Sequence, residues 1–160
     1  MQERRIIPLS EIAELGKTLS AKGLRIVLTN GCFDILHPGH VRYLAQAHEL
    51  GDILVVGLNS DASVRLLKGE DRPINCGEDR AEVLSALRCV DYVTIFPQMR
   101  ATELIHALRP HIYTKGGDYS PESLNSEELT ALREIGTDIQ ILPLVPGKST
   151  TRVIERLKKG

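Results

Sequence analysis

The sequence has no tryptophan, and aromatic residues make up only 4% of its 160 positions. It also has no apolar run near the roughly 20 residues that a membrane-spanning helix needs, and no signal-peptide core follows its first five residues. Its three cysteines lack the paired spacing of a disulfide framework, which favours a reducing compartment. These absences argue against a membrane span and a disulfide scaffold, and we expect a cytoplasmic protein.

The sequence also lacks an excess of charge of either sign. Its formal net charge is −1, which gives no general attraction for nucleic acid or for a membrane surface. Any attraction for phosphate must therefore be local. Hydrophobic residues are 42% and charged residues 26%, as in ordinary globular domains. With no internal repeat or long linker, we expect one domain over residues 25–160, with a helical extension over residues 1–24 packed on it.

Short apolar runs alternate with helical patterns along the chain. The runs predict strands over residues 25–29, 53–58, 92–96, 112–114 and 139–142. The periodic segments predict helices over residues 10–21, 41–50, 78–88, 101–108 and 127–135, with a last helix after residue 151. The polar connection over residues 63–73 is expected to be a loop. This alternation predicts a single α/β domain with a doubly wound, Rossmann-like, parallel five-stranded sheet, whose strand order the pattern does not give.

Three helices carry more detailed expectations. Ser10 is expected to cap the first helix and Gly23 to end it. The third is expected to present an inner face that includes Val83. The last helix is expected to bury Val153, Ile154 and Leu157 as its inner face.

Residues 29–40 join the first expected strand to the next helix through a tight loop. A helix start offers free N–H groups and a positive dipole end, which suit a phosphate. His37 and His40 lie on one face of that first turn, and Gly31 and Gly39 allow close approach of the backbone. A lone histidine is usually an ordinary surface or core residue, but two histidines that bracket Pro-Gly after a strand favour an anion site.

Basic and hydroxyl residues elsewhere have two interpretations each. Lys68, Arg72 and Arg80 form either a solvated charged face or a phosphate clamp. Lys115–Asp118 is either a glycine turn or part of the nucleotide or sugar-phosphate site. Residues 149–151 cap the last helix, and a cap is compatible with phosphate binding.

Two further groups favour structural roles. Asp34 and Asp61 could act as an acid–base pair, but we expect them to hold the loop by hydrogen bonds. Cys32, His37 and His40 could form a metal cluster, yet they fall short of the four ligands of a structural zinc site. Cys32 is expected to be a small buried apolar residue.

Several of these motifs carry a resemblance. His37-Pro38-Gly39-His40 is similar to the H-x-G-H signature of the nucleotidylyltransferase superfamily, and residues 30–34 resemble the lead-in of its cytidylyltransferase-like branch. The order and spacing of the motifs resemble the family of D-glycero-β-D-manno-heptose 1-phosphate adenylyltransferases. The segments that carry this resemblance are 30–37, 59–63, 67–69, 72–75, 86–87, 90–91, 115–119 and 149–151.

The resemblance implies a sheet order of 3-2-1-4-5 and the transfer of an adenylyl group from ATP to the sugar phosphate, giving ADP-heptose and pyrophosphate. It implies catalytic roles for His37, His40 and Lys68. The implied nucleotide-binding residues are Thr29, Asn30, Gly31, Phe33, Gly39, Arg80, Lys115, Gly116, Ser149, Thr150 and Thr151. The implied substrate-binding residues are Asp34, Asn59, Asp61, Arg72 and Asp118. The resemblance assigns no role to Lys148, which directly precedes residues 149–151.

The resemblance also implies Mg²⁺ held by the phosphates of ATP rather than by a protein metal site, a homodimer, and a sugar kinase on a separate chain. Three alternatives stay open. One is another sugar- or alcohol-phosphate cytidylyltransferase or adenylyltransferase, such as one acting on glycerol 3-phosphate. The others are a non-catalytic nucleotide-binding module and a small metal-binding protein.

Overall fold

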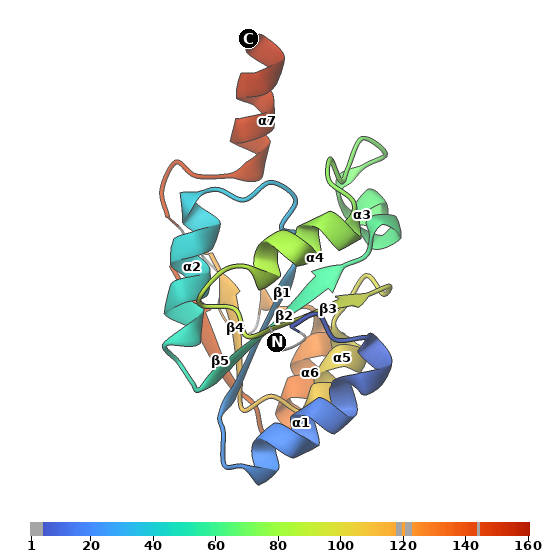
Figure 1. Ribbon diagram of the computed structural model, residues 1–160, viewed down its shortest axis with the longest axis vertical. Coiled ribbons are helices and arrows are strands. Elements are labelled where there is room, and N and C mark those ends of the chain that lie inside the picture. The colour runs from blue at the N-terminus through green and yellow to red at the C-terminus, as the bar shows by residue number, and fades with distance from the viewer. Residues whose placement is uncertain (1–4, 118–119, 121–122, 144) are drawn as a thin grey trace.

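A computed structural model describes residues 5–117, 120, 123–143 and 145–160 of the chain. Five parallel strands form one sheet in the order β3-β2-β1-β4-β5 (Figure 1). This is the order that the resemblance implied. The strands are β1 (Ile26–Gly31), β2 (Ile53–Asn59), β3 (Tyr92–Phe96), β4 (Ile112–Gly116) and β5 (Asp138–Leu142). All five predicted strands are confirmed, with ends shifted by two residues at most.

Helices cover both faces of the sheet, as a doubly wound fold requires. The helices that cover one face are α1 (Ile12–Ala21), α5 (Thr102–Leu108) and α6 (Ser126–Glu134). The other face carries α2 (Pro38–His48) and α4 (Gly77–Ser85). Each face has its own buried cluster, with Leu104 and Leu132 in the first and Leu44 and Leu84 in the second.

The segment before β1 completes the first of these faces. A 3₁₀ turn (Leu9–Glu11) leads into α1, and Glu11 rather than Ser10 is the N-cap residue. The expected Ser10 cap is therefore wrong, because the chain begins its helical turn as a 3₁₀ turn before α1. At the other end Gly23 has a φ of +75°, and the helix ends there as predicted.

Helix α1 lies so close to α5 that only glycine fits at the crossing. A Cβ atom on Gly16 would lie 2.4 Å from the Leu108 carbonyl oxygen. This contact fixes the distance between the two helices and holds the N-terminal segment against the core.

One predicted loop contains a helix. Residues 61–68 form α3 (Asp61–Lys68), capped by the Ser60 hydroxyl, which accepts a hydrogen bond from the Ser63 backbone N–H. The loop prediction for residues 63–73 is therefore wrong over its first half. The helix buries only Ser63 and Val64, and its other apolar side chains, Leu66 and Leu67, are exposed.

Two predicted inner faces are also wrong in part. Val83 on α4 is 52% exposed, because Arg80, Ala81 and Leu84 face the core instead. Helix α7 (Thr150–Lys159) has no buried residue, and Leu157 is 72% exposed. Figure 1 shows α7 extending away from the sheet, and of its expected core positions Val153 and Ile154 are only half-buried.

The start of α7 is nevertheless attached to the domain. The Thr150 hydroxyl donates to the Ile35 carbonyl in the loop between β1 and α2, at 2.9 Å. That bond places the two helix starts together at the carboxyl edge of the sheet, where ligands bind in folds of this kind. No helix among the described residues combines the length and the apolar character that crossing a membrane requires.

Candidate functional site

A cavity of about 540 Å³ lies at the carboxyl edge of the sheet. The ends of β1, β2 and β4 and the starts of α2 and α7 all contribute to its wall. The residues that line it are Asn30, Gly31, Cys32, Phe33, Asp34, His37, His40, Asn59, Leu67, Lys68, Arg72, Met99, Arg100, Lys115, Glu128, Lys148, Ser149, Thr150 and Thr151. Most of the residues proposed from the sequence are thus brought together in one place.

His37 is the N-cap residue of α2. Its backbone is extended, Pro38 takes the first helical position, and the His37 Nδ1 atom accepts a hydrogen bond from the Gly39 N–H at 3.0 Å. A neutral ring that accepts at Nδ1 carries its proton on Nε2. The helix cap therefore orients His37 so that its Nε2–H can donate to a ligand.

His40 stacks on His37. The two ring centroids are 3.9 Å apart with an interplanar angle of 27°, and the Phe33 ring lies 5.3 Å from that of His40. Burial, and then the charge of His37, lowers the pKa of His40 to about 4. Burial, and then the charge of Lys148, also lowers the pKa of His37. Near neutral pH the pair is uncharged and can approach an anion as N–H donors.

Gly39 makes this pair possible. A Cβ atom at Gly39 would lie 2.7 Å from the Cε1 atom of His37 and 3.0 Å from the Cβ atom of Lys148. The first turn of α2, the imidazole of His37 and the segment before α7 therefore meet at one residue without a side chain. This supports the expectation that Gly39 allows close approach of the backbone.

The start of α7 faces the same cavity. The Ser149 hydroxyl accepts from the Arg152 N–H at 3.1 Å, which confirms the predicted cap. Lys148 precedes this cap and lies near enough to His37 to lower its pKa. Two helix starts and the Lys148 ammonium group thus present positive potential to one space.

Asp34 holds the loop between α3 and α4, as expected from the sequence. Its carboxylate accepts from the backbone N–H groups of Ile74 and Asn75 and from the Arg72 Nε atom at 2.8 Å. Burial alone would raise the pKa of Asp34, but these hydrogen bonds outweigh burial and lower it. The Asp34 side chain is fully buried and already bound by these groups. Asp34 therefore positions the loop and leaves no free carboxylate oxygen for a substrate.

Arg80 does not take the place in a phosphate clamp that was one of the two interpretations from the sequence. Its guanidinium is fully buried and donates to the Asn75 carbonyl, to the Cys32 carbonyl at 2.7 Å and to Asp61 Oδ1 at 2.7 Å. Neither Arg80 nor Asp61 lines the cavity. The pair instead connects α4, the start of α3 and the loop after β1, so both residues position the site from beneath it.

Thr29 and Gly116, which were also proposed, are absent from the cavity wall. The Thr29 side chain is buried and its hydroxyl lies 2.7 Å from the Tyr43 hydroxyl, so Thr29 links β1 to α2. Gly116 is the last residue of β4 and is absent from the cavity lining. Asp118 lies outside the described residues.

Several cavity residues were not proposed from the sequence. Cys32 was expected to be a buried apolar residue but is half-buried and faces the cavity, and burial raises the pKa of its thiol. Arg100 follows β3, and its position after a parallel strand could have indicated it. Glu128 gave no signal, because it stands in a run of polar helical residues.

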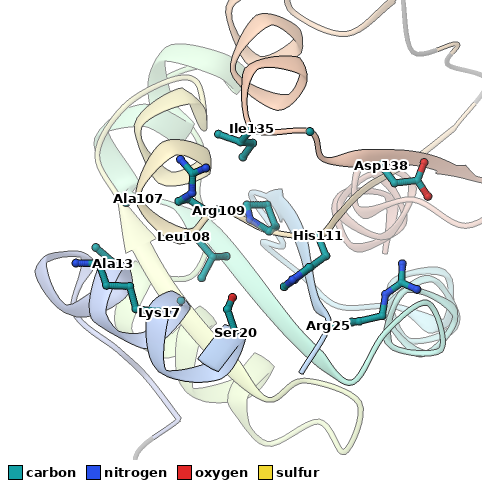
Figure 2. Close-up of a pocket in the computed structure, with 13 residues that line it drawn as sticks. Ala13, Lys17, Ser20, Arg25, Ala107, Leu108, Arg109, His111, Ile135 and Asp138 are labelled. Carbon is teal, nitrogen blue, oxygen red and sulfur yellow. The ribbon is translucent and has the colours of Figure 1, made fainter. Parts of the chain in front are cut away.

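A second cavity, of about 690 Å³, opens between α1 and the ends of α5 and α6, on the side where β4 and β5 begin (Figure 2). Lys17, Arg25, Arg109 and His111 lie around it, and it contains none of the residues proposed for the site. Within the described part of the chain, no group of three or more His, Cys, Asp and Glu residues is placed to hold a metal ion.

Comparison with known proteins identifies relatives of the chain. The family model described as "Cytidylyltransferase-like" matches residues 28–156. The chain is 54% identical over 146 residues to the "Bifunctional protein HldE" of Pelobacter propionicus, covering 91% of this chain and 30% of that protein. It is 51% identical over 151 residues to the HldE protein of Campylobacter concisus, covering 94% of this chain and 31% of that one. The chain therefore spans about a third of the length of these relatives.

A solved structure has the same fold. It is the lipopolysaccharide core biosynthesis protein from Thermoplasma volcanium, with a TM-score of 0.64 and 30% sequence identity. The match covers 77% of this chain and 98% of that one. The matched residues run from within β1 to within α7 and include the histidine pair and the hydroxyl-rich helix start. The chain belongs to the cytidylyltransferase-like family.

Proposed function

We propose that the chain is an adenylyltransferase that converts ATP and D-glycero-β-D-manno-heptose 1-phosphate to ADP-heptose and pyrophosphate. The observation that carries the proposal is the stacked pair of histidines at the start of α2, which shares one cavity with the capped start of α7. The chain matches about a third of the length of the HldE proteins, and its residues 28–156 match the cytidylyltransferase-like family model. This similarity supports the choice of a sugar phosphate as the substrate.

The chemistry is a displacement at phosphorus. An oxygen of the sugar phosphate attacks the α-phosphorus of ATP, a new P–O bond forms, and the bond between the α-phosphorus and its bridging oxygen breaks to release pyrophosphate. A phosphate dianion is already nucleophilic, so the reaction needs no general base. The work of the protein is to align two polyanions and to stabilise the charge that grows on the leaving group.

The residues divide between the two reacting groups. The Nε2–H of His37, the ring of His40 and the hydroxyls at the start of α7 would contact the phosphates of ATP. Lys68 and Arg72, on and after α3, would contact the sugar phosphate side of the cavity or the leaving pyrophosphate. Neutral histidines suit this role because burying two imidazolium ions beside Lys148 would be costly.

The cavity also fits an ion that is carried by the nucleotide. The carboxylate of Asp34 is occupied by protein donors, and Asp61 is paired with Arg80, so neither offers a ready ligand. Mg²⁺ commonly keeps several waters and binds nucleotide phosphates directly, which matches a site without a protein cage. When bound, the ion would neutralise phosphate charge.

Turnover with defined substrates tests this proposal. The purified chain would be incubated with ATP, Mg²⁺ and a set of sugar 1-phosphates, with pyrophosphate release and the mass of the nucleotide sugar as readouts. The proposal predicts ADP-heptose from the β-anomer of heptose 1-phosphate. Product with CTP and an alcohol phosphate would favour a cytidylyltransferase, and ATP binding without any turnover would favour a binding module.

The source of the sugar 1-phosphate, the oligomeric state and the location of the protein complete the proposal. The chain spans about a third of its HldE relatives, so we propose that a sugar kinase outside these 160 residues supplies the sugar 1-phosphate. A homodimer and a cytoplasmic location belong to the same proposal. Size measurement in solution and cell fractionation would test them.

A further inference from the structure

Glu128 is a buried acidic residue that the chemistry above does not use. It stands in the first turns of α6 with 2% of its surface exposed, yet it is one of the residues that line the cavity. Acidic residues are rarely so buried unless their oxygens are paired. Its environment therefore requires an explanation.

Only one oxygen of Glu128 has a partner. Oε1 accepts a hydrogen bond from the Ala101 backbone N–H at 2.8 Å, at the start of α5. Oε2 is buried and has no hydrogen-bond partner among the described residues. The two oxygens thus differ, one holding a neighbouring helix start and the other left without a donor.

The surroundings of Glu128 place it where β1 and β4 end. Tyr113 on β4 donates its hydroxyl proton to Asn30 Oδ1 on β1 at 2.6 Å. Burial, and then the negative charge of Glu128, raises the pKa of Tyr113 well above its usual value. Glu128 lines the same cavity as Asn30 and Lys115, which lie at the ends of these two strands, where the sheet order reverses and a ligand crevice opens.

The Tyr113 bond also orients the Asn30 amide. Because Oδ1 accepts from Tyr113, the Nδ2 hydrogens of Asn30 remain as donors on the wall of the cavity. A donor on Asn30 and an acceptor on Glu128, which line the same cavity, match the two-sided bonding of a hydroxyl group. A phosphate would be repelled by Glu128, and an apolar group would leave it unpaired.

We propose that Glu128 Oε2 accepts a hydrogen bond from a hydroxyl group of a bound substrate, which is either the ribose of the nucleotide or the sugar of the sugar phosphate. The inference rests on the proposed function in that both candidate substrates come from it. A hydrogen bond from a substrate hydroxyl would satisfy the oxygen that the protein leaves unpaired, and loss of such a bond to a charged group weakens binding by roughly 10- to 100-fold.

Glu128→Gln is the direct test. The amide keeps an oxygen that can accept from the Ala101 N–H, but it replaces Oε2 with an NH₂ group that can only donate. Glu127→Gln is the matched control, because Glu127 is its exposed neighbour in the same helix turn and loses the same charge. Both variants would be compared with the unchanged chain in dissociation constants for ATP, 2′-deoxy-ATP and 3′-deoxy-ATP, and in KM for the sugar phosphate.

The two sources of the hydroxyl give different results. If it belongs to ribose, Glu128→Gln weakens ATP binding by about 10-fold or more, and the preference for ATP over one deoxy analogue disappears. If it belongs to the sugar, ATP binding stays within twofold and KM for the sugar phosphate rises by a similar factor. The proposal would be overturned if both substrates change by less than twofold in a Glu128→Gln variant whose melting temperature equals that of the Glu127→Gln control.

Two further measurements keep the test decisive. If Glu128→Gln does not fold, the unchanged chain is tested with analogues that each lack one hydroxyl of the ribose or of the sugar. A penalty under threefold for every analogue overturns the proposal. If no sugar 1-phosphate is turned over but Glu128→Gln weakens ATP binding, the inference stands and the proposed function fails. If a sugar 1-phosphate is turned over and the Glu128→Gln and Glu127→Gln variants behave alike, the proposed function stands and the inference about Glu128 fails.

Discussion

At the residue scale, the stacked histidines combine two properties that oppose each other in most sites. Burial keeps the pair uncharged, with the pKa of His40 at about 4, while the helix start and Lys148 supply positive potential beside it. An uncharged N–H donor is cheaper to hold in a closed cavity than an ion. It can still strengthen its hydrogen bond as charge grows on a leaving pyrophosphate.

Replacing His40 tests that assignment. His40→Ala is expected to fold and to bind ATP in part, but to lose turnover by on the order of 10²–10³, because a preorganised donor to the leaving group is gone. Steady-state kinetics with a pyrophosphate readout would measure this. His106→Ala, at an exposed position in α5, is the control and should keep full activity. A His40→Ala chain with near-full activity would refute the role.

The lowered pKa of His40 also predicts how stability depends on pH. An unfolded chain has this histidine near its usual value of 6.5, and the folded chain near 4, so the unfolded state binds more protons between these limits. Stability is therefore retained above pH 6.5 and lost as the pH falls toward 4. His37 contributes in the same direction.

Thermal melts from pH 7.5 to 4 would check this, with His40→Asn as the comparison. The unchanged chain should lose more of its melting temperature over this interval than the His40→Asn variant, which lacks the titrating ring. Parallel curves for the two proteins would show that the pKa of His40 is not depressed.

Residue spacing predicted the histidine pair because a helix start fixes where two residues three apart must lie. Spacing could not say which way Arg80 points. A guanidinium after a loop suits a phosphate as well as it suits carbonyl oxygens, and here the Cys32 and Asn75 carbonyls and Asp61 surround it. Glu128 was missed for the same reason, since its burial depends on the start of α5, distant in sequence.

At the element scale, the starts of α2 and α7 form the two walls of the phosphate side, and one hydrogen bond connects them. Thr150→Val removes the Thr150 hydroxyl that donates to Ile35 and keeps the size of the side chain. We expect nucleotide binding to weaken by about tenfold, because without this hydrogen bond the start of α7 is no longer held at a fixed distance from the start of α2.

Thr130→Val is the matched control for this change. The Thr130 hydroxyl also donates to a backbone carbonyl, at 2.8 Å, but on the exposed side of α6 away from the cavity. Titration calorimetry with an ATP analogue would compare the variants. Equal affinities for Thr150→Val and Thr130→Val would contradict a role for the contact between the helix starts.

The sequence predicted elements well where burial determines the pattern. β2 is apolar on both faces, and its run could be recognised without knowing its neighbours. Helix α3 was missed because most of its residues are exposed, and α7 was given an inner face because its apolar stripe resembles that of a packed helix. A stripe in the sequence does not reveal whether anything lies opposite it.

At the scale of the whole molecule, a chain of net charge −1 builds its site from local charge alone. Segments from residue 30 to residue 151 meet in one cavity, because parallel strands bring their carboxyl ends to one edge. The five-stranded order itself came from family resemblance, since alternation of strands and helices fits several orders. Helix α1, together with α5 and α6, covers the sheet face opposite the one that carries α2 and the histidines.

Gly16→Ala tests that support separately from the chemistry. The added methyl would overlap the Leu108 carbonyl, and overpacking of this kind costs roughly 1–3 kcal/mol of unfolding free energy. The melting temperature should fall by about 3–10 °C. Activity per folded molecule should stay unchanged at a temperature where the variant is folded. Ser20→Ala, exposed on the same helix, is the control, and an equal melting temperature for both variants would contradict the contact.

The most direct test of the account is the position of bound nucleotide. A crystal structure of the chain with Mg²⁺ and a non-hydrolysable ATP analogue should show the triphosphate within hydrogen-bond distance of His37 and His40 and at the start of α7. A triphosphate bound instead in the basic cavity at the opposite edge, beside Lys17, Arg25 and Arg109, would contradict it.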